Sequence, residues 1–564
     1  TMRRFIAFVV IVLAIGMVAA LPDAIGRAAP ASGPIEAGDT VILNGRLFDG
    51  TGALPIEDGL VAVRGERMIA VGPRGDFDVP DGAEIIDAGG GFIMPGVIDS
   101  HVHLGESVFL GNDVLTPWLQ DGVTTVRDLF ICGACVPALR RVIPIVAHDP
   151  PRVVIAGPGF TSPGGPRADS GLVVNNEEEA RAGVAYLLDE QGADLIKLYD
   201  PEMPLSISQA IVEEAHARGK RVASHPDGLV SAIAAGVDDV THPPRTEVSD
   251  ELLQQAADAG IEMNSTLNGS PRDVLARYRD LGGVIAMGTD TPAAPGCQLP
   301  LYEMRDMVAS GLTPREVLVA STKHAAIVSA LGTELGTLEV GKIADIIVVD
   351  GDPLADISAM EDVSLVMKGG RLVDLTPPVA THDQFAFAKS IGALPFSDIA
   401  NFYCAGGEVG EHVASCVFEE TPRTVWYRFT PEADGPLRVD LSVGVLNQPS
   451  RADAVGVYTG TALESLTEVA CGYDQVTFAA EADTTYYLQI HGYAAGEDVF
   501  RSSSGTVQLE RASAEGAVVP QLPSTGVGSR GSKGWLLWGL VGALAGVALL
   551  AAAVACRPRW HRGG

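Results

Sequence analysis

Two histidines at the end of an apolar run are the first residues of this sequence whose types and spacing could do chemistry. Residues 91–105 read GFIMPGVIDSHVHLG, in which an apolar run ends in Asp99, His101 and His103. The run predicts a fully buried strand. Side chains alternate between the two faces of a strand, so both imidazoles are expected on one face. Such a pair is half of a metal site, although it can also be a simple polar strand end.

Four more residues with metal-binding or catalytic side chains follow apolar runs further along the chain. Lys197 lies inside LIKLY, His225 ends VASH, His242 ends DVTH and Asp290 ends AMGTD. Each has a structural alternative. The lysine could form a salt bridge, the two histidines could be hydrogen-bonded core residues, and the aspartate could cap a helix. All of them falling at strand ends by accident is much less probable than any one doing so, which favours a shared site.

The elements that must position these residues alternate between strand and helix over residues 93–334. This alternation and length predict an α/β fold, a (β/α)8 TIM barrel, in which catalytic residues gather at the C-terminal strand ends. The strand candidates are 93–101, 123–128, 152–156, 194–199, 221–225, 239–242, 261–266 and 284–290, and helical candidates include 177–191, 206–218, 250–259 and 271–281.

Two short segments rich in strand and turn patterns flank the barrel. Residues 38–92 alternate short apolar runs with Gly and Asp turns, and residues 335–376 show the same pattern far downstream. Neither segment is long enough to bury a core alone. We therefore expect them to join as the two parts of one small β-domain.

The motifs PGVIDSHVHLG, GVTTVRD, ADLIKLY, VASH, DVTH, AMGTD and GTLEVGKIADIIVVDGDPLADI, taken in this order, resemble the amidohydrolase superfamily. The similar branch is that of imidazolonepropionase-like and Xaa-Pro dipeptidase-like enzymes. The resemblance implies that the flanking segments form a composite β-sandwich. It also implies two zinc ions: one held by His101, His103 and Asp290, the other by His225 and His242, with carboxylated Lys197 bridging both.

The chemistry that the resemblance implies is hydrolysis of a C–N bond. Two divalent metal ions would lower the pKa of a bound water and polarise the substrate carbonyl. Asp290 would act as the general base, moving a proton to the leaving nitrogen. Tyr199 and Arg245 follow ligand-bearing strands and are candidate substrate contacts. The family often has Gly-Gly-His after the third strand, where this chain has Gly-Gly-Pro at residues 164–166, so the substrate stays open.

The C-terminal third of the chain has a different pattern. Residues 377–394 form a polar connector, and residues 395–511 alternate short strand patterns with turns, which predicts a separate all-β sandwich. VWYRFTP and TYYLQIHGY resemble the pre-peptidase C-terminal type of accessory domain. Cys404 and Cys416 lie in one segment and could form a disulfide, and His491 is expected to be packed rather than metal-bound.

Both ends of the sequence carry processing signals. Residues 1–31 are predicted to be a secretory signal peptide. Residues 512–534 are a linker that contains Leu522, Pro523, Ser524, Thr525 and Gly526, an LPxTG motif. Residues 535–555 are long and apolar enough for one transmembrane helix, and residues 556–564 form a basic cytoplasmic tail. This order resembles a Gram-positive sortase signal and predicts an extracellular protein anchored to the cell wall or plasma membrane.

The composition argues against one class of binding partner. The formal net charge of −32 makes nucleic acid an unfavourable partner. The expected function is that of a surface-anchored, metal-dependent amidohydrolase, with a small peptide or an N-acyl amino acid as substrate and with sortase, cell wall and membrane as partners. A cyclic-amide hydrolase, a deaminase of the same superfamily and an inactive surface binding protein are the alternatives.

Overall fold

A computed structural model describes most of the chain between residues 33 and 512. The described residues are 33–104, 108, 115–131, 136–147, 149–199, 203–225, 228–267, 271–290, 300–375, 385–401, 411, 413–417, 423–443, 454–473, 475–492 and 504–512. Within these ranges no helix is both long and apolar enough to cross a bilayer. The predicted signal peptide, the LPxTG motif, the predicted span 535–555 and Cys404 lie outside the described residues.

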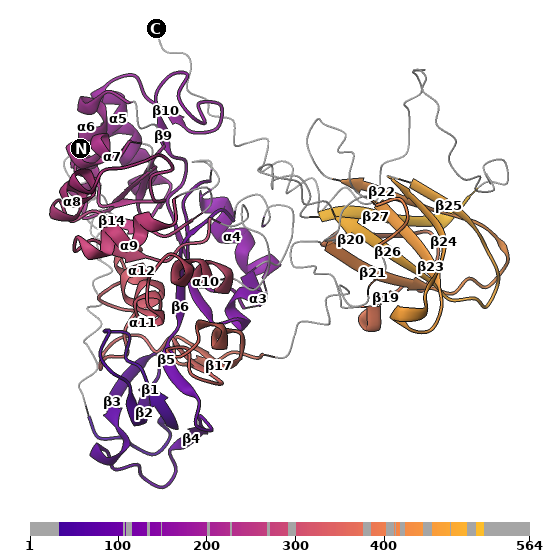
Figure 1. The fold of residues 1–564 in the computed structure, drawn as a ribbon, viewed down its shortest axis with the longest axis horizontal. Helices are drawn as coiled ribbons and strands as arrows, with labels where there is room; N and C mark the ends of the chain where they lie inside the picture. The colour runs from indigo at the N-terminus through magenta and orange to yellow at the C-terminus, as the bar shows by residue number, and fades with distance from the viewer. Residues whose placement is uncertain are drawn as a thin grey trace, which may run out of the picture.

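Short parallel strands form the predicted barrel (Figure 1). In chain order they are β6 (Val97–Val102), β7 (Val123–Asp128), β8 (Arg152–Ile155), β11 (Ile196–Leu198), β12 (Val222–Ser224), β13 (Asp239–Val240), β14 (Glu262–Asn264) and β15 (Val284–Ala286). Backbone bonds link the strands that do not pair directly: Asp194 donates to Ile155 at 2.7 Å and Ser100 to Met287 at 3.1 Å. The second of these bonds places β15 beside β6, so the strand order closes on itself.

Helices follow most of these strands and share one continuous apolar cluster with them. Side-chain caps begin several of the helices, with Asn176, Ser249 and Thr313 accepting backbone N–H groups of the first turn. The helices are α3 (Leu115–Gln120), α4 (Val136–Val146), α5 (Glu177–Ala185), α6 (Leu205–His216), α7 (Leu229–Ala235), α8 (Asp250–Asp258), α9 (Asp273–Asp280), α10 (Leu301–Ala309), α11 (Pro314–Val319) and α12 (Ala325–Val328), with π-helical turns at Tyr186–Glu190 and Ala320–His324.

The two flanking segments meet in one eight-stranded sheet. Its strands are β1 (Thr40–Leu47), β2 (Ile56–Arg64), β3 (Arg67–Pro73), β4 (Glu84–Asp87), β5 (Phe92–Pro95), β16 (Ile346–Val349), β17 (Val363–Lys368) and β18 (Arg371–Leu372), with 3-10 turns at Arg74–Asp76 and Ile357–Glu361. β5 and β16 pair antiparallel and join the segments. The predicted strand 93–101 is therefore two strands, because its first half belongs to this sheet and its second half to the barrel.

The C-terminal domain packs a five-stranded sheet against a four-stranded one (Figure 1). Their orders are β19-β21-β26-β23-β24 and β20-β27-β22-β25. The strands are β19 (Lys389–Ser390), β20 (Phe396–Asn401), β21 (Arg423–Phe429), β22 (Gly435–Val443), β23 (Ala454–Thr459), β24 (Thr467–Tyr473), β25 (Gln475–Ala480), β26 (Tyr486–Gly492) and β27 (Ser504–Arg511), with 3-10 turns at Phe385–Phe387 and Leu463–Ser465. The domain thus begins before the predicted residue 395, since β19 pairs with β21.

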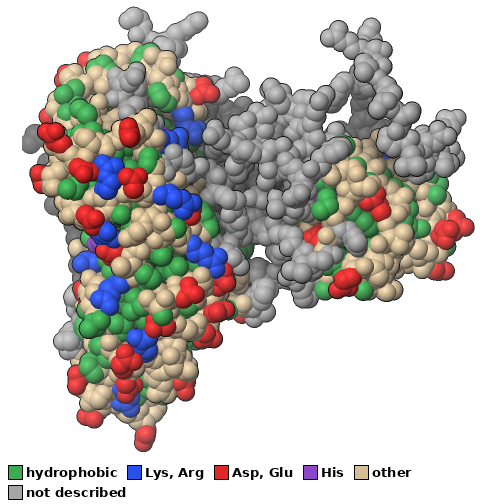
Figure 2. Space-filling model, in the orientation of Figure 1, with side chains coloured by type: hydrophobic (Ala, Val, Ile, Leu, Met, Phe, Trp, Pro, Cys, Tyr) green, Lys and Arg blue, Asp and Glu red, His purple; other side chains and the backbone are tan. Residues whose placement is uncertain are grey.

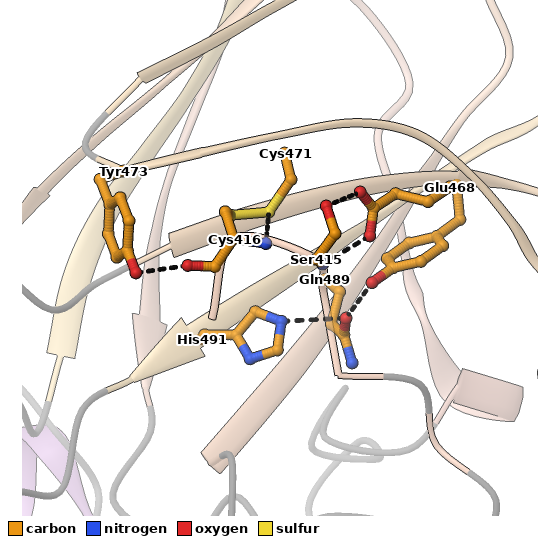
Figure 3. Close-up of a disulfide and its surroundings, with 8 residues drawn as sticks. Ser415, Cys416, Glu468, Cys471, Tyr473, Gln489 and His491 are labelled. Carbon is orange, nitrogen blue, oxygen red and sulfur yellow. Dashed lines mark hydrogen bonds between the residues drawn. A yellow bond between two sulfur atoms is a disulfide. The ribbon is translucent and has the colours of Figure 1, made fainter. Parts of the chain in front are cut away.

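The predicted Cys404–Cys416 disulfide is wrong. Cys416 is bonded to Cys471 of β24, with 5.8 Å between the two Cα atoms (Figure 3). Closeness in sequence suggested Cys404, but the fold brings residues 413–417 beside β24, where Ser415 and Cys416 also contact Glu468 and Tyr473. Tertiary contacts, not local spacing, determine this pairing.

The surface carries the charge that the composition predicted. Acidic side chains recur over both the barrel and the sandwich in Figure 2, and basic side chains are interspersed with them over the barrel. Many of these charges pair, for example Arg181 with Glu213 at 2.6 Å and Arg305 with Glu361 at 2.5 Å. Exposed pairs of this kind contribute little to stability, about 0–1 kcal/mol each.

Candidate metal centre and active site

Three of the predicted ligands meet at the C-terminal ends of β6 and β15. The Nε2 atoms of His101 and His103 lie 3.2 Å and 2.8 Å from Oδ1 of Asp290. Nε2 of His242, just after β13, lies 3.7 Å from the other carboxylate oxygen. One donor atom from each of His101, His103 and Asp290 lies within 4.8 Å of the others. The site therefore gathers imidazoles from two strands around one carboxylate.

The backbone is shaped to bring Asp290 to the imidazoles. Asp290 has a φ of 57°, in the left-handed region that aspartate tolerates better than most residues, and its N–H donates to the carbonyl of His101 at 2.7 Å. Gly288 allows the close approach of the two strand ends, because a Cβ there would lie 2.7 Å from the Cβ of His101. Strand pairing and one glycine thus position the carboxylate.

The tautomer of His101 follows from its hydrogen bonds. Its Nδ1 lies 2.9 Å from the backbone carbonyl of Thr241, which can only accept, so Nδ1 carries the proton. Burial lowers the pKa of His101 well below its usual value, so the ring is neutral and Nε2 presents a lone pair. That lone pair faces the Asp290 carboxylate. A cation bound beside these two electron-rich atoms, which lie 3.2 Å apart, would stabilise the arrangement.

The chemistry of this donor set fits a divalent transition metal ion. Imidazole nitrogen and carboxylate oxygen are ligands that zinc takes, and the Nδ1–H bond of His101 to a carbonyl is the usual support of a metal-bound histidine. Burial also lowers the pKa of His242 to about 3, which keeps this imidazole neutral and able to bind a metal. Burial would raise the pKa of Asp290, but the neighbouring histidines, with His103 as a hydrogen-bond donor, lower it and keep the carboxyl ionised.

Lys197 and His225 lie on the adjoining side of the same barrel mouth. The His225 ring is 5.2 Å from that of His242, between centroids, and Lys197 donates a hydrogen bond to the Thr241 side chain. Lys197 is 1% exposed, and burial lowers its pKa to about 7. A neutral amine is the form that can be carboxylated, whereas an ammonium cannot bind a metal. All six predicted ligands thus lie at one end of the barrel.

Buried carboxylates and one buried arginine support these residues, and sequence reasoning gave them no role. Asp99 accepts hydrogen bonds from the Thr289 N–H at 3.0 Å and hydroxyl at 2.6 Å, which fixes the segment before Asp290. Arg127 binds both oxygens of Asp239 at 3.1 Å and 2.8 Å, and neither side chain is exposed. The signal was present, because VRD and DVTH both place charges inside apolar runs.

The two predicted substrate contacts lie beside the ligands. The ring of Tyr199 is stacked 6.0 Å from that of His225, at an interplanar angle of 28°. Arg245 is exposed, and its positive charge helps to lower the pKa values of His225 and His242 after burial. Sequence reasoning missed Phe130, whose ring meets that of Tyr199 edge to face, and Arg167, whose guanidinium lies over both rings.

Glu303 on α10 is a further buried acid that the sequence did not reveal. It is 2% exposed, and its Oε1 has no hydrogen-bond partner among the described residues. Burial raises its pKa to about 8, a rise that hydrogen bonds from Ser265 and the Leu267 backbone partly oppose. At neutral pH this carboxyl is therefore largely protonated.

Comparison with known proteins identifies the family of this chain. The model of the amidohydrolase family matches residues 92–373, half of the 564 residues. Imidazolonepropionase of Symbiobacterium thermophilum is 26% identical over 57% of this chain and 91% of its own length. Adenine deaminase 2 of a Bradyrhizobium species is 27% identical over 62% of this chain, which spans only 59% of that protein.

Solved structures show the same likeness. A crystal structure of a prolidase complexed with N-methylphosphonate-L-proline is 25% identical, with a TM-score of 0.51, and covers 59% of this chain and 99% of the prolidase. The matched family typically depends on metal ions, and the relatives named here act on C–N bonds. The chain belongs to the amidohydrolase family and is an enzyme of that class.

Proposed function

We propose that this chain hydrolyses an amide or peptide bond of a small substrate at the barrel mouth, using one or two divalent metal ions. The observation that carries the proposal is the lone pair of His101 directed at the Asp290 carboxylate, which a bound cation explains. A small peptide with proline or an N-acyl amino acid is the proposed substrate. The likeness to a prolidase bound to a proline derivative supports this choice.

Each residue of the site has a proposed role in the reaction. A metal ion bound here would lower the pKa of a water molecule toward neutrality and polarise the substrate carbonyl. His101, His103 and His242 hold their Nε2 atoms toward one carboxylate and would form the ligand shell. Asp290 is ionised, so it can take a proton from the attacking water as the C–O bond forms. It then gives that proton to the leaving nitrogen as the C–N bond breaks.

Lys197 is proposed to act as a carboxylated lysine that bridges two metal ions, with His225 and His242 on the second. Its full burial and lowered pKa support this role. Lys197→Ala should remove most activity and lower the metal content. If the lysine serves only as a carrier of a carboxylate, added formate or acetate should restore part of the turnover. If Lys197 served only in a salt bridge, Lys197→Ala would not be rescued by the added carboxylate and its metal content would be unchanged.

A substrate panel tests the proposed reaction. Purified metal-replete protein is offered Xaa-Pro and other dipeptides, N-acyl amino acids and five-membered cyclic amides, and ammonia release from adenine is followed separately. Turnover of the first two classes supports the proposal. Turnover of only cyclic amides or adenine favours the alternative that the imidazolonepropionase and deaminase relatives suggest. If metal-bound protein shows no turnover in any assay, the remaining alternative is an inactive surface binding protein.

We also propose that the protein is exported and anchored at the cell surface. The order of LPSTG, apolar span and basic tail supports this proposal. In a host with an active sortase, Thr525→Ala should move the protein from the cell wall to the membrane or medium. Unchanged wall attachment would show that the motif is incidental.

A further inference from the structure

We infer that Arg167 is a specificity-determining residue that binds a free carboxylate of the substrate, beside the metal ligands. This inference rests on the proposed function and narrows it to dipeptides and N-acyl amino acids with an unblocked C-terminal carboxylate. Arg167 lies in the turn between β9 (Phe160–Thr161) and β10 (Leu172–Val173). It is neither a predicted ligand nor a neighbour of one in sequence.

The position of the guanidinium connects it to the site through one aromatic ring. Its Cζ lies 5.3 Å from the centre of the Tyr199 ring and 4.6 Å from that of Phe130. The same Tyr199 ring stacks on His225 and lies 5.2 Å from Nζ of Lys197. A group bound by Arg167 would therefore be separated from the proposed second metal position by the Tyr199 ring. A small substrate is long enough to contact both positions.

Close contacts hold both the Tyr199 ring and the turn that carries Arg167 in place. Gly159 packs directly on the Tyr199 ring, and a Cβ there would come within 1.9 Å of its Cδ2 atom, so no other residue fits. The Tyr199 N–H donates to the Phe160 carbonyl at 2.9 Å. Arg167 has a φ of 57°, and its carbonyl accepts from Gly171 at 2.6 Å. A left-handed arginine costs energy, so the turn holds this side chain against an intrinsic preference.

The charge of Arg167 is free for a ligand. It is exposed, and among the described residues no carboxylate lies within 4.0 Å of its guanidinium. Arginines such as Arg181 and Arg218, by contrast, each contact two acids. Arg167 also forms a hydrogen bond with the Tyr199 side chain. Its remaining N–H groups can be donated to a carboxylate, which can accept two of them.

The test compares a free acid with its amide. Cleavage of the Leu–Pro bond is followed in L-leucyl-L-proline and in L-leucyl-L-prolinamide, with full-length metal-replete protein. The wild type should prefer the free acid by about 10- to 100-fold in kcat/KM, mainly through KM, as expected for a charge-assisted pair. Arg167→Met should lose most of that preference, because the fall in kcat/KM should be much larger for the free acid than for the amide. Arg167→Lys should keep part of it, because the charge remains without the planar fork.

A matched control is Arg141→Met, an exposed arginine on α4, which should keep the full preference. A preference that survives in Arg167→Met would overturn the inference, as would an equal loss on both substrates, which indicates that Arg167 only supports Tyr199. If Arg167→Met does not fold by its melting curve, Arg167→Gln replaces it.

A binding measurement separates this inference from the proposed function. Calorimetry compares L-proline with L-prolinol, neither of which contains a bond to be hydrolysed. If no peptide is cleaved, the proposed function fails, yet selective binding of L-proline that is lost in Arg167→Met would sustain the carboxylate site. Equal affinities for L-proline in wild type and Arg167→Met would contradict it.

Discussion

The barrel and the C-terminal sandwich each bury histidine, and they use it in opposite ways. In the sandwich, Nε2 of His491 donates to Oε1 of Gln489 at 2.9 Å (Figure 3). Its buried Nδ1 lone pair has no partner among the described residues. In the barrel, Nδ1 of His101 donates to a carbonyl and its Nε2 lone pair faces a carboxylate. Burial lowers the pKa of both rings, to about 4 for His491. The difference lies in what each lone pair meets.

The surrounding network explains why one histidine is structural. Gln489 donates from Nε2 to Glu411 at 2.7 Å, which fixes its orientation, and its Oε1 accepts from both Tyr458 and His491. Every bond there pairs a donor with an acceptor. Beside Asp290, the Nε2 lone pair of His101 faces an ionised carboxylate and not a donor. An imidazole lone pair directed at a carboxylate indicates a cation-binding site, whereas the His491 ring is held by the uncharged amide of Gln489 and is packed.

The largest expected effect is on turnover, and it is seen by comparing one isosteric substitution in each of the two networks. Asp290→Asn keeps the shape and an oxygen but cannot accept a proton, so turnover should fall by at least about 10²- to 10⁴-fold. Glu411→Gln, the matched change in the sandwich, should leave turnover unchanged. Steady-state rates, metal content and melting curves are compared for both variants. Near-native turnover in metal-replete Asp290→Asn would leave that residue without a role in proton transfer.

The next effect concerns the stability of the sandwich. Replacing Cys416 and Cys471 together by serine removes a cross-link between residues 55 positions apart. Loss of such a cross-link typically costs about 2–4 kcal/mol. Scanning calorimetry should show the sandwich transition at a lower temperature, with the barrel transition and the hydrolysis rate unchanged. A matching loss of activity would mean that the two domains are coupled and that the sandwich is not purely structural.

The smallest effect is a pH dependence of barrel stability. The folded pKa of Glu303 is raised to about 8, so the unfolded chain releases this proton first as the pH rises. The stabilising contribution of the protonated group is complete below about pH 4.5 and is lost as the pH rises to about 8, at up to about 1.4 kcal/mol per pH unit. Glu303→Gln should flatten this slope.

The control for Glu303 is Glu190→Gln, a change at an exposed position after α5. Melting curves from pH 5 to pH 8.5 should run parallel for Glu190→Gln and the wild type, and diverge for Glu303→Gln. Parallel curves for all three proteins would show that Glu303 is not buried as a neutral acid.

Sequence reasoning succeeded where chemistry is encoded locally. The alternation of strand side chains placed His101 and His103 on one face, and both Nε2 atoms reach Oδ1 of Asp290. The predicted strand 123–128 is β7 without change. These features depend on neighbouring residues, so the pattern alone was sufficient.

Sequence reasoning failed where contacts between distant segments determine the structure. Cys416 pairs across the sandwich with Cys471, and Glu303 is buried because α10 packs near Ser265, although a glutamate on a helix normally suggests a solvent-exposed face. Arg167 was missed because its exposed turn has no periodicity and its partners Phe130 and Tyr199 come from other loops. Only the tertiary structure brings these residues together.

The most direct test of the account is the metal content of the purified protein. Elemental analysis of wild type should find at least about one divalent transition metal ion per chain. His101→Asn with His103→Asn should lose most of it while remaining folded, and His491→Asn should retain it in full. Wild-type protein that hydrolyses its substrate without bound metal, at a rate that strong chelators do not change, would contradict the proposed metal centre.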